Sequence, residues 1–247
     1  MATTSIEWTE MTWNPTTGCT KISSGCKNCY AEIMTRRLIA MGKKKYAAGF
    51  DKIKTHQNTL MIPYTWKSNK LVFVDSMSDL FHKDVPLKFI KQVFNVMNEN
   101  PHHTFQILTK RAERLYELNK ELEWTNNIWM GVTVENKDEI NRIGYLKKTN
   151  AKIKFLSLEP LLGFLKNLSL KKIDWVIVGG ESGFNARPMN PEWVKNIKEQ
   201  CKQNNVPFFF KQWGAWGEDG IKRNKKENGS LLLGKQWKEE PIVCKGE

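Results

Sequence analysis

The stretch WVIVGGESG, which runs from Trp175 to Gly183, contains the pattern that decides the fold class. Its first four residues are an unbroken apolar run, and the next five form a polar, glycine-rich turn. Asn190-Pro191 then precedes apolar residues at helical spacing, among them Val194 and Ile197. An unbroken apolar run is typical of a strand that is covered on both faces, as in a parallel sheet. The stretch therefore predicts a strand, a loop and a helix in succession.

Other apolar runs repeat this unit along the chain. They are Leu71–Val74, Phe105–Leu108, Ile128–Val132, Ile153–Leu156 and Val206–Phe210. Asp84-Val85-Pro86 predicts the start of a helix whose apolar residues lie between Phe89 and Met97, and Ala31–Met41 is another candidate helix. Alternation of strands and helices predicts an α/β fold with a parallel sheet. The first strand lacks the glycine-rich turn of a dinucleotide-binding fold, which favours a partial or distorted (β/α) barrel of six or seven strands.

Composition sets the class of protein and its compartment. The 247 residues are 40% hydrophobic and carry a formal net charge of +13, so the chain has enough apolar mass for a core. It holds no apolar run of about 18–20 residues and no secretory signal pattern, which predicts a cytoplasmic protein. We expect a barrel domain over residues 1–216, with a basic insertion at 36–70, and a C-terminal extension over residues 217–247.

Polar signatures stand where the predicted strands end. They are residues 75–82 (DSMSDLFH), 109–111 (TKR), 133–136 (TVEN), 157–160 (SLEP) and 179–183 (GGESG). In a parallel barrel the carboxyl ends of all strands face one way, and their loops build the active site. We therefore expect these side chains to share one pocket. The alternative is that they are polar only because loops lie at the surface.

Three of the five cysteines lie within eleven residues, at Cys19, Cys26 and Cys29. Thiolates are soft ligands that suit zinc or an iron–sulfur cluster. A structural zinc site needs four protein ligands, and the nearest histidine is the distant His56. An iron–sulfur cluster with one open position is therefore the preferred interpretation, and zinc is the alternative. Cys201 and Cys244 stand alone, and Cys201 is predicted to be a buried apolar residue.

Three cysteines in a loop at the head of a parallel βα array resemble the radical S-adenosylmethionine (SAM) superfamily. There three cysteines hold a 4Fe–4S cluster, and SAM chelates the fourth iron. The spacing here is Cys-x6-Cys-x2-Cys, where the superfamily usually has CxxxCxxC. The motifs WNP, TGCTKISSGCKNCYAE, SMSDLFH, LTKR, GVTVEN, SLEPLLG, VGGESG and FKQWG are also similar to those of the three-Cys-motif proteins. This phage- and prophage-borne family of unknown function is considered radical-SAM-like, with spore photoproduct lyase as a distant relative.

The resemblance implies a set of roles for the strand-end residues. Cys19, Cys26 and Cys29 hold the cluster, whereas SAM is bound by Ser76, Ser78, Asp79, Thr133 and Glu135. The side chains that then face the substrate are Glu159, Glu181, Lys110, Arg111 and His82. The implied reaction is reductive cleavage of SAM to a 5′-deoxyadenosyl radical, which abstracts hydrogen from the substrate. Some members of the family are found beside a partner protein, which implies such a partner here.

Several residues have a simpler structural interpretation. Lys110 and Arg111 are equally well explained as ion-pair partners of Glu135 or Glu159. His102 and His103 are predicted to be solvent-facing turn residues. Four tryptophans flank the first and last units, and we expect them to pack in the core, with base stacking as the alternative for the last two. They are Trp8, Trp13, Trp213 and Trp216.

The basic charge is concentrated between Arg36 and Lys70. This segment holds nine Lys and Arg residues against the single acid Asp51. A basic flap near an active site predicts a nucleic-acid substrate, for repair or base modification. The alternative is a lysine-rich composition without function. Two other functions stay open, which are a zinc- or cluster-stabilised nucleic-acid-binding protein without catalysis and a radical enzyme acting on a protein or small molecule.

Overall fold

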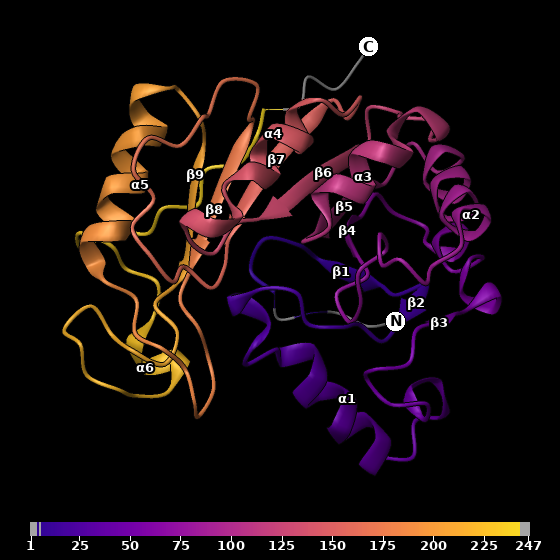
Figure 1. Cartoon of the computed structure of the whole chain (residues 1–247), viewed down its shortest axis with the longest axis horizontal. Coiled ribbons are helices and arrows are strands. Elements are labelled where there is room, and N and C mark those ends of the chain that lie inside the picture. The colour runs from indigo at the N-terminus through magenta and orange to yellow at the C-terminus, as the bar shows by residue number, and fades with distance from the viewer. Residues whose placement is uncertain (1–3, 5, 243–247) are drawn as a thin grey trace.

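A seven-stranded parallel sheet organises the chain, with strand order β1-β4-β5-β6-β7-β8-β9 (Figure 1). The computed structural model describes residues 4 and 6–242. The strands of the sheet are β1 (Met11–Trp13), β4 (Leu71–Val74), β5 (Thr104–Thr109), β6 (Ile128–Thr133), β7 (Ile153–Leu158), β8 (Trp175–Gly179) and β9 (Phe208–Gln212). A separate antiparallel pair consists of β2 (Thr16–Thr17) and β3 (Lys54–Thr55).

Six α-helices accompany the strands in the described part of the chain. They are α1 (Tyr30–Ala40), α2 (Leu87–Asn98), α3 (Ala112–Leu118), α4 (Asn141–Lys147), α5 (Pro191–Gln203) and α6 (Lys225–Asn228). Short 3-10 turns occupy Ser24–Cys26, Lys44–Tyr46, Gln57–Thr59, Pro63–Thr65, Asn119–Glu121 and Lys137–Glu139. No helix within residues 4 and 6–242 is long and apolar enough to cross a bilayer.

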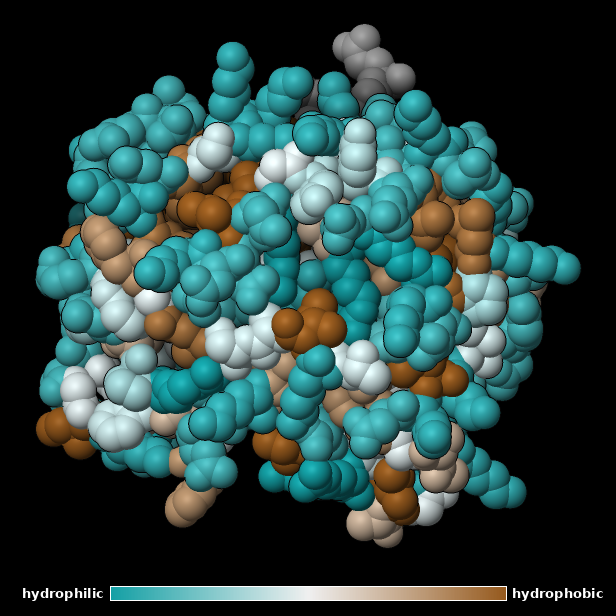
Figure 2. Space-filling view, viewed as in Figure 1, coloured by the Kyte–Doolittle hydropathy of each residue, from teal (hydrophilic) through white to brown (hydrophobic). Residues whose placement is uncertain are grey.

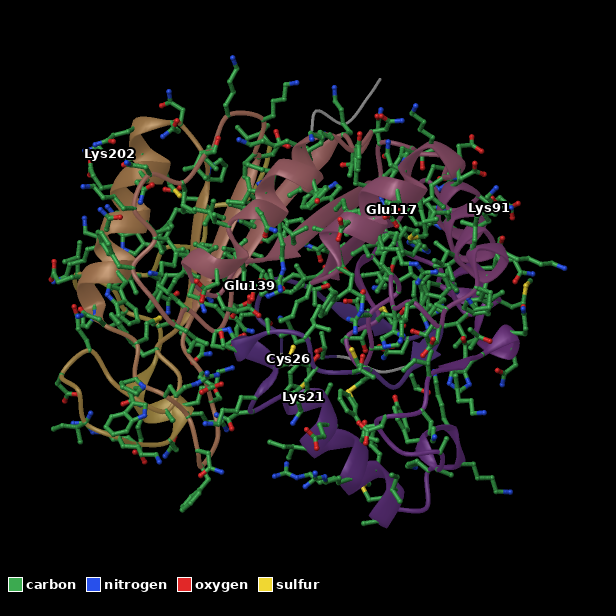
Figure 3. The ribbon with its side chains drawn as sticks, viewed as in Figure 1. Lys21, Cys26, Lys91, Glu117, Glu139 and Lys202 are labelled. Carbon is green, nitrogen blue, oxygen red and sulfur yellow. The ribbon has the colours of Figure 1, made fainter. Side chains whose placement is uncertain are left out.

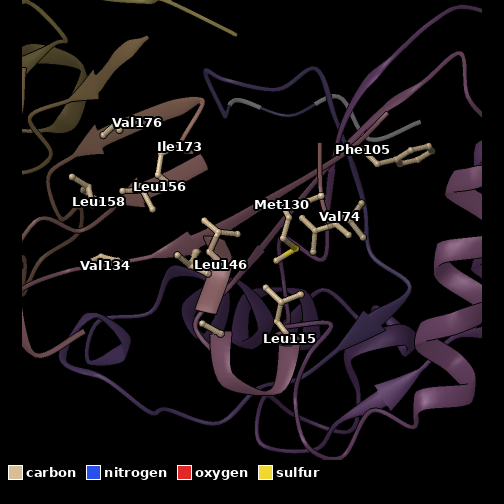
Figure 4. Packing of buried hydrophobic residues seen from close by; sticks show 14 of the residues in the cluster. Val74, Phe105, Leu115, Met130, Val134, Leu146, Leu156, Leu158, Ile173 and Val176 are labelled. Carbon is tan, nitrogen blue, oxygen red and sulfur yellow. The ribbon is translucent and has the colours of Figure 1, made fainter. Parts of the chain in front are cut away.

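The two faces of the sheet pack into different layers because side chains alternate along each strand. On β6, Met130 and Val132 belong to the large outer core, whereas Trp129 belongs to a smaller cluster on the inner face. Figure 4 shows the outer layer, where Leu115 of α3 and Leu146 of α4 pack with strand residues. The helices α2, α3, α4 and α5 thus cover the outer face.

The inner face is filled by aromatic rings, and their contacts show that the sheet curls. The Trp8 ring lies 4.7 Å from that of Phe73 on β4 and 6.4 Å from that of Trp175 on β8. In a flat sheet these two strands, four positions apart, would be separated by roughly 19 Å. The sheet therefore wraps around Trp8. Because β1 and β9 do not pair with each other within the described chain, the structure is an open half-barrel.

The sequence predicted this fold class, and the structure confirms a partial parallel barrel of seven strands. All six predicted apolar runs contribute strands. The helix predicted over Ala31–Met41 is α1, and the helix predicted after Asn190-Pro191 is α5, which the Asn190 side chain caps by accepting from the Glu192 amide at 2.9 Å. The capping role expected of Asp84 is wrong, because α2 begins only at Leu87, after Pro86.

The crossover between β7 and β8 also differs from the expected strand–helix alternation. Residues 159–174, all described by the structure, contain no helix. Backbone φ angles of 59° at Asn167 and 66° at Lys172 are incompatible with a continuous helix. The crossover instead buries leucines against the outer core, including Leu161 and Leu165. The crossover therefore covers the outer face of the sheet at a place where a helix was expected.

The last described part of the chain lies along the free edge of β9. The Phe210 amide donates to the Trp237 carbonyl at 2.8 Å, and the Glu239 amide donates to the Phe208 carbonyl at 3.3 Å. A tight turn joins Leu232 and Lys235 through two backbone hydrogen bonds. The Lys225 Nζ atom at the start of α6 lies 2.8 Å from Glu7 Oε1. The segment before the edge strand β1 is therefore in contact with the segment after the other edge strand, β9. Cys244 lies outside the described residues.

Candidate functional site

The loop from Gly18 to Cys29, here called the cysteine loop, lies across the carboxyl ends of the strands. The Cys19 amide donates to the Phe50 carbonyl at 2.7 Å. The Ser78 hydroxyl, just past β4, donates to the Gly18 carbonyl at 2.6 Å. Gly18 has φ +87°, and a Cβ atom there would overlap the Lys52 carbonyl, so only glycine fits. The first cysteine is thus fixed between β4 and the basic insertion.

Two buried strand-end carboxylates hold the middle of the cysteine loop. Ser23 Oγ donates to Glu135 Oε1 at 2.6 Å, beyond the end of β6. Asn28 Nδ2 donates to Glu181 Oε2 at 3.0 Å, beyond the end of β8. Arg187 joins this second contact, since its Nη2 donates to Glu181 at 2.6 Å and to the Ser24 carbonyl at 3.0 Å. The loop is therefore anchored at the ends of β6 and β8, in addition to its contact with the end of β4.

The three thiols of the loop are free and half-buried. Arg111 Nη1 donates to Cys19 Sγ at 3.6 Å, while burial and the nearby Asp79 carboxylate raise the pKa of Cys19 to about 11. Ser23 Oγ lies 3.6 Å from Cys26 Sγ, and Cys29 is the N-cap residue of the eleven-residue α1. Figure 3 shows Cys26 where the cysteine loop faces the sheet. The hydroxyl beside Cys26 and the helix N-terminus at Cys29 suit sulfur ligands that carry negative charge, whereas at Cys19 burial and Asp79 outweigh the contact with Arg111.

The sulfur atoms do not surround a single point. Within the described residues, no three Cys, His, Asp or Glu side chains converge as they would around one metal ion. The cysteines of a 4Fe–4S cluster bind different irons, so they encircle a body rather than share an ion. The donor chemistry of the loop, three soft thiols without a nearby fourth ligand, therefore fits a cluster better than a four-ligand zinc site.

Asp79 lies at the centre of a network that uses both of its oxygens. Thr109 Oγ1 donates to Oδ1 at 2.7 Å, and Arg111 Nη1 donates to Oδ2 at 2.9 Å. The backbone amides of Phe81 and Lys110 donate to it as well. Arg111 in turn binds the Thr20 carbonyl at 2.9 Å, so the network joins the ends of β4 and β5 to the cysteine loop.

The other residues expected to bind SAM have mixed environments. Ser76 Oγ donates to Asn14 Oδ1 at 3.1 Å, and its carbonyl accepts from the Tyr30 hydroxyl. Thr133 is buried at the end of β6, and its carbonyl accepts from Arg142 at 2.8 Å. Glu135 is fully buried, with Oε2 2.9 Å from the same guanidinium. The structure thus places these side chains at the carboxyl ends of β4 and β6, as the strand-end pattern predicted, and that they share one pocket stays a prediction.

The expected substrate-facing residues also follow strand ends, but each contacts a different partner. Lys110 Nζ lies 3.5 Å from Glu135, whereas Arg111 pairs with Asp79 and with neither glutamate expected from the sequence. Glu159 precedes a cis proline bond and pairs with Lys211 on β9 at 3.0 Å. This pair lies on the inner face, where Gly179 leaves the space that the Glu159 side chain fills.

Two histidines are buried, one of them against expectation. His82 is fully buried, and its Nε2 lies 2.8 Å from Thr20 Oγ1 while Nδ1 accepts from the Asp84 amide at 3.2 Å. Burial and the nearby Arg111 charge lower the pKa of His82. His103, predicted to face solvent, is fully buried because its ring packs against Trp66 and its Nδ1 accepts from the Lys70 amide.

The flanking tryptophans are core residues in most cases. Trp8, Trp13 and Trp213 are buried, and the Trp213 indole donates to the Leu231 carbonyl at 2.7 Å. The core interpretation is therefore confirmed for these three, and stacking on Trp213 is excluded. Trp216 is half-buried, and its indole donates to the Ala186 carbonyl at 2.7 Å.

Several residues of the site were missed by sequence reasoning. They are Ser23, Asn28, Arg142, Arg187 and Lys211. Asn28 lies inside the cysteine motif, and Arg187 stands six residues after Glu181, so proximity to a motif was the available signal. The sequence holds no signal for Arg142 or Lys211, because a basic residue in a helix or strand usually faces solvent and is not expected in a site. Together with Arg111, these cations pair with every strand-end carboxylate of the set Asp79, Glu135, Glu159 and Glu181.

Comparisons with known proteins place the chain in a family but not in an activity. No curated protein matches it. Among solved structures, "Spore photoproduct lyase complexed with dinucleoside spore photoproduct" is similar at 12% identity and a TM-score of 0.42. The similarity covers 76% of this chain and 59% of that protein, so the chain spans well under two thirds of its length. A family described as "Protein of unknown function (DUF5131)" matches residues 3–241. The chain therefore belongs to the DUF5131 family of proteins of unknown function.

Proposed function

We propose that this protein is a radical-SAM-like iron–sulfur enzyme that acts on nucleic acid, by repair or base modification. The observation that carries the proposal is the position of the cysteine loop. Three free, half-buried thiols lie at the carboxyl-end mouth of a parallel half-barrel. That edge is where parallel barrels assemble their active sites.

Cys19, Cys26 and Cys29 are the proposed cluster ligands. When bound, a 4Fe–4S cluster supplies the electron that cleaves SAM to a 5′-deoxyadenosyl radical. Arg111 stabilises negative charge on Cys19 through its 3.6 Å contact with the sulfur, and Ser23 does the same for Cys26. Glu135 and Glu181 fix the loop from below, which keeps the spacing of the thiols constant.

The remaining strand-end residues divide into two proposed groups. Asp79 and Glu135 act mainly as positioning residues, because protein donors already occupy their oxygens. Ser76, Ser78 and Thr133 line the side assigned to SAM. Glu159, with Lys211, and Lys110 face the substrate, and His82 supports the loop through Thr20.

The charge distribution supports a polyanionic substrate. A cavity of about 440 Å³ in the basic insertion is lined by Lys44, Lys45, Lys54 and His56. The strand-end carboxylates do not repel phosphate, because each is neutralised by a paired cation. Phosphate contacts by lysine and arginine supply most of the affinity for nucleic acid.

The same neutralisation favours a second candidate function. Unpaired carboxylates at the mouth of the half-barrel would count against a zinc- or cluster-stabilised nucleic-acid-binding protein without catalysis, because they repel phosphate. Since these carboxylates are paired, that objection no longer applies. The metal content and the reaction of SAM separate the two functions.

The test is anaerobic purification followed by iron and sulfide assays and a visible spectrum. We expect a brown protein with about four irons per chain. Cys19→Ala, Cys26→Ala and Cys29→Ala should each abolish the cluster, whereas Cys201→Ala, a buried helix position, should retain it. With SAM and dithionite, the wild-type protein should form 5′-deoxyadenosine. A colourless protein with one stoichiometric zinc would contradict the proposal and support the binding function.

A further inference from the structure

A second cavity lies beside the cysteine loop, between the starts of α3 and α4. Its volume is about 370 Å³, at the lower end of the range for ligand pockets. Ile22 of the cysteine loop forms one wall, and the cationic lining residues are Lys83, Lys110, Arg111, Arg114 and Arg142. Two acids, Glu113 and Glu139, also line it, so five cationic side chains face two acidic ones. Glu139, labelled in Figure 3, pairs with Arg142.

The cations of this cavity differ in how firmly they are held. Arg111 and Arg142 are tied to Asp79 and Glu135, and Arg114 donates to the carbonyls of His82 and Val85. The arginines are therefore held in place, and two of them are already paired, Arg111 with Asp79 and Arg142 with Glu135 and Glu139. Lys83 is exposed and takes part in no ion pair among the described residues, while Lys110 has only its 3.5 Å contact with Glu135. The two lysines are thus available to an anion from outside.

Two aromatic rings continue the cavity along the helices. Tyr145 of α4 lines the cavity, and its ring centroid lies 5.9 Å from that of Tyr116 on α3. Tyr116 is 41% exposed. Lys148 Nζ lies over both rings, at 5.4 Å from Tyr116 and 6.0 Å from Tyr145. Figure 2 shows a mainly hydrophilic surface on this view of the molecule, with apolar atoms in separate patches.

We propose that this α3–α4 groove binds a single-stranded stretch of nucleic acid that flanks the nucleotide at the cysteine-loop mouth. Phosphate groups contact Lys83 and Lys110, and a base stacks on Tyr116 and Tyr145. A base that takes the place of Lys148 over the rings leaves that amine free for the next phosphate. Cationic grooves with exposed aromatic rings are the usual way to hold a single strand, because a duplex hides the faces of its bases. The inference rests on the proposed nucleic-acid function and names the form of the substrate.

The experiment measures fluorescence anisotropy of a labelled single-stranded oligodeoxynucleotide of about twelve residues, with the full chain. Titrations are repeated between roughly 50 and 200 mM salt. Lys83→Gln should reduce the slope of log affinity against log salt by about 1. Tyr116→Ala should weaken binding about 5- to 100-fold, whereas Tyr116→Phe should bind as the wild type does, because it keeps the ring.

The matched control is Lys202→Gln, an exposed lysine on α5 that Figure 3 shows far from Cys26. It should leave affinity and salt slope unchanged, and unchanged circular dichroism will show that every variant is folded. If the wild type binds but Lys83→Gln and Tyr116→Ala behave as Lys202→Gln does, the groove assignment is wrong and the proposed function stands. If the wild type binds no oligonucleotide even at low salt, both the groove assignment and the proposed nucleic-acid function are wrong. If poly-glutamate displaces the strand and Tyr116→Ala has no effect, the groove binds acidic protein instead.

Discussion

At Gly25 the cysteine loop passes directly over the Glu135 side chain, and the space between them is smaller than one carbon atom. A Cβ atom at this position would overlap the carboxyl group and Cγ of Glu135. Glu135 cannot move aside cheaply, because Arg142 and Ser23 hold it in a fully buried position. The absence of a side chain at residue 25 therefore determines how closely the loop approaches β6.

We predict that Gly25→Ala destabilises the protein by about 1–3 kcal/mol, the usual cost of overpacking. It should also lower the iron content after anaerobic reconstitution, because the loop is pushed away from its anchor. Gly144→Ala is the control, since an added Cβ on α4 meets no atom within 4 Å. That change should be neutral or stabilising by up to about 1 kcal/mol. Equal stability of the two variants in urea denaturation would refute this account.

The Asp75 carboxyl group at the end of β4 is buried, which makes its charged form unfavourable. Its oxygens accept from the Thr16 amide and hydroxyl at 2.9 and 2.8 Å, and its φ of 57° is a conformation that Asp and Asn tolerate. Burial raises its pKa to about 7, with Asp79 raising it further and Lys45 opposing the shift. The folded protein therefore takes up a proton between about pH 4 and 7 that the unfolded chain does not.

Because the folded-state pKa of this acid is raised, its contribution to stability falls as pH rises from about 4 to 7 and is constant above. Asp75→Asn removes the titration and keeps one acceptor for Thr16. We predict that the variant matches the wild type near pH 4 and gains stability relative to it by pH 8, by at most about 4 kcal/mol. Thermal unfolding across this pH range is the measurement, and a difference independent of pH would contradict the prediction.

At the scale of the elements, the cysteine loop is held by its contacts and has little regular structure of its own. Its regular part is the 3-10 turn at Ser24–Cys26, and α1 begins directly after the loop at Tyr30. Arg187 contacts Glu181 through three nitrogens and reaches the Ser24 carbonyl, so it joins the loop after β8 to the cysteine loop. Removing it breaks a link between two loops without disturbing a strand.

We predict that Arg187→Gln speeds hydrogen exchange of backbone amides in residues 24–29 by about tenfold, because local opening loses charged hydrogen bonds. Exchange within β6 and β8 should not change. Arg36→Gln is the matched control, since this exposed arginine pairs only with Glu32 on its own helix. Mass spectrometry of peptides that cover the loop will measure both. Equal exchange in the two variants would show that Arg187 does not anchor the loop.

Elements differ in how well the sequence predicts them. The strands could be predicted because burial on both faces leaves unbroken apolar runs such as WVIV. The irregular crossover after Glu159 could not be predicted, because its leucines are buried as they would be in a helix although its backbone is not helical. Among the site residues, Glu135 and Glu181 were predicted to lie at the mouth, but their attachment to Ser23 and Asn28 depends on a fold that brings residues more than a hundred positions apart together.

At the scale of the whole molecule, the aromatic cluster inside the curl holds the strands at their curvature. Trp175 is at its centre, with the rings of Trp8, Trp129, Phe155 and Phe209 all within 6.4 Å of its own. Its indole also donates to the Glu239 carbonyl at 2.7 Å. One side chain thus joins the inner faces of several strands to the segment along β9.

We predict that Trp175→Ala costs about 3–5 kcal/mol of unfolding free energy, the usual loss for a large buried aromatic residue. Phe184→Ala is the control, because Phe184 is 89% exposed and should change stability by less than about 0.5 kcal/mol. Urea denaturation followed by circular dichroism measures both. A loss below about 1 kcal/mol for Trp175→Ala would show that the cluster does not stabilise the curl.

The single ion pair between Glu7 and Lys225 has a mechanical consequence. In a closed barrel, backbone hydrogen bonds join neighbouring strands all the way round and fix the circumference, whereas this sheet is open between β1 and β9. Besides the rings around Trp8 and the contacts of the cysteine loop, one partly exposed ion pair joins the segments that flank its two free edges, and this pair contributes only about 0–1 kcal/mol. The free-energy cost of opening the sheet further therefore comes mainly from bending the sheet and from loosening the packing of the aromatic rings around Trp8. Salt weakens this ion pair, so we expect high ionic strength to make the two edges easier to separate.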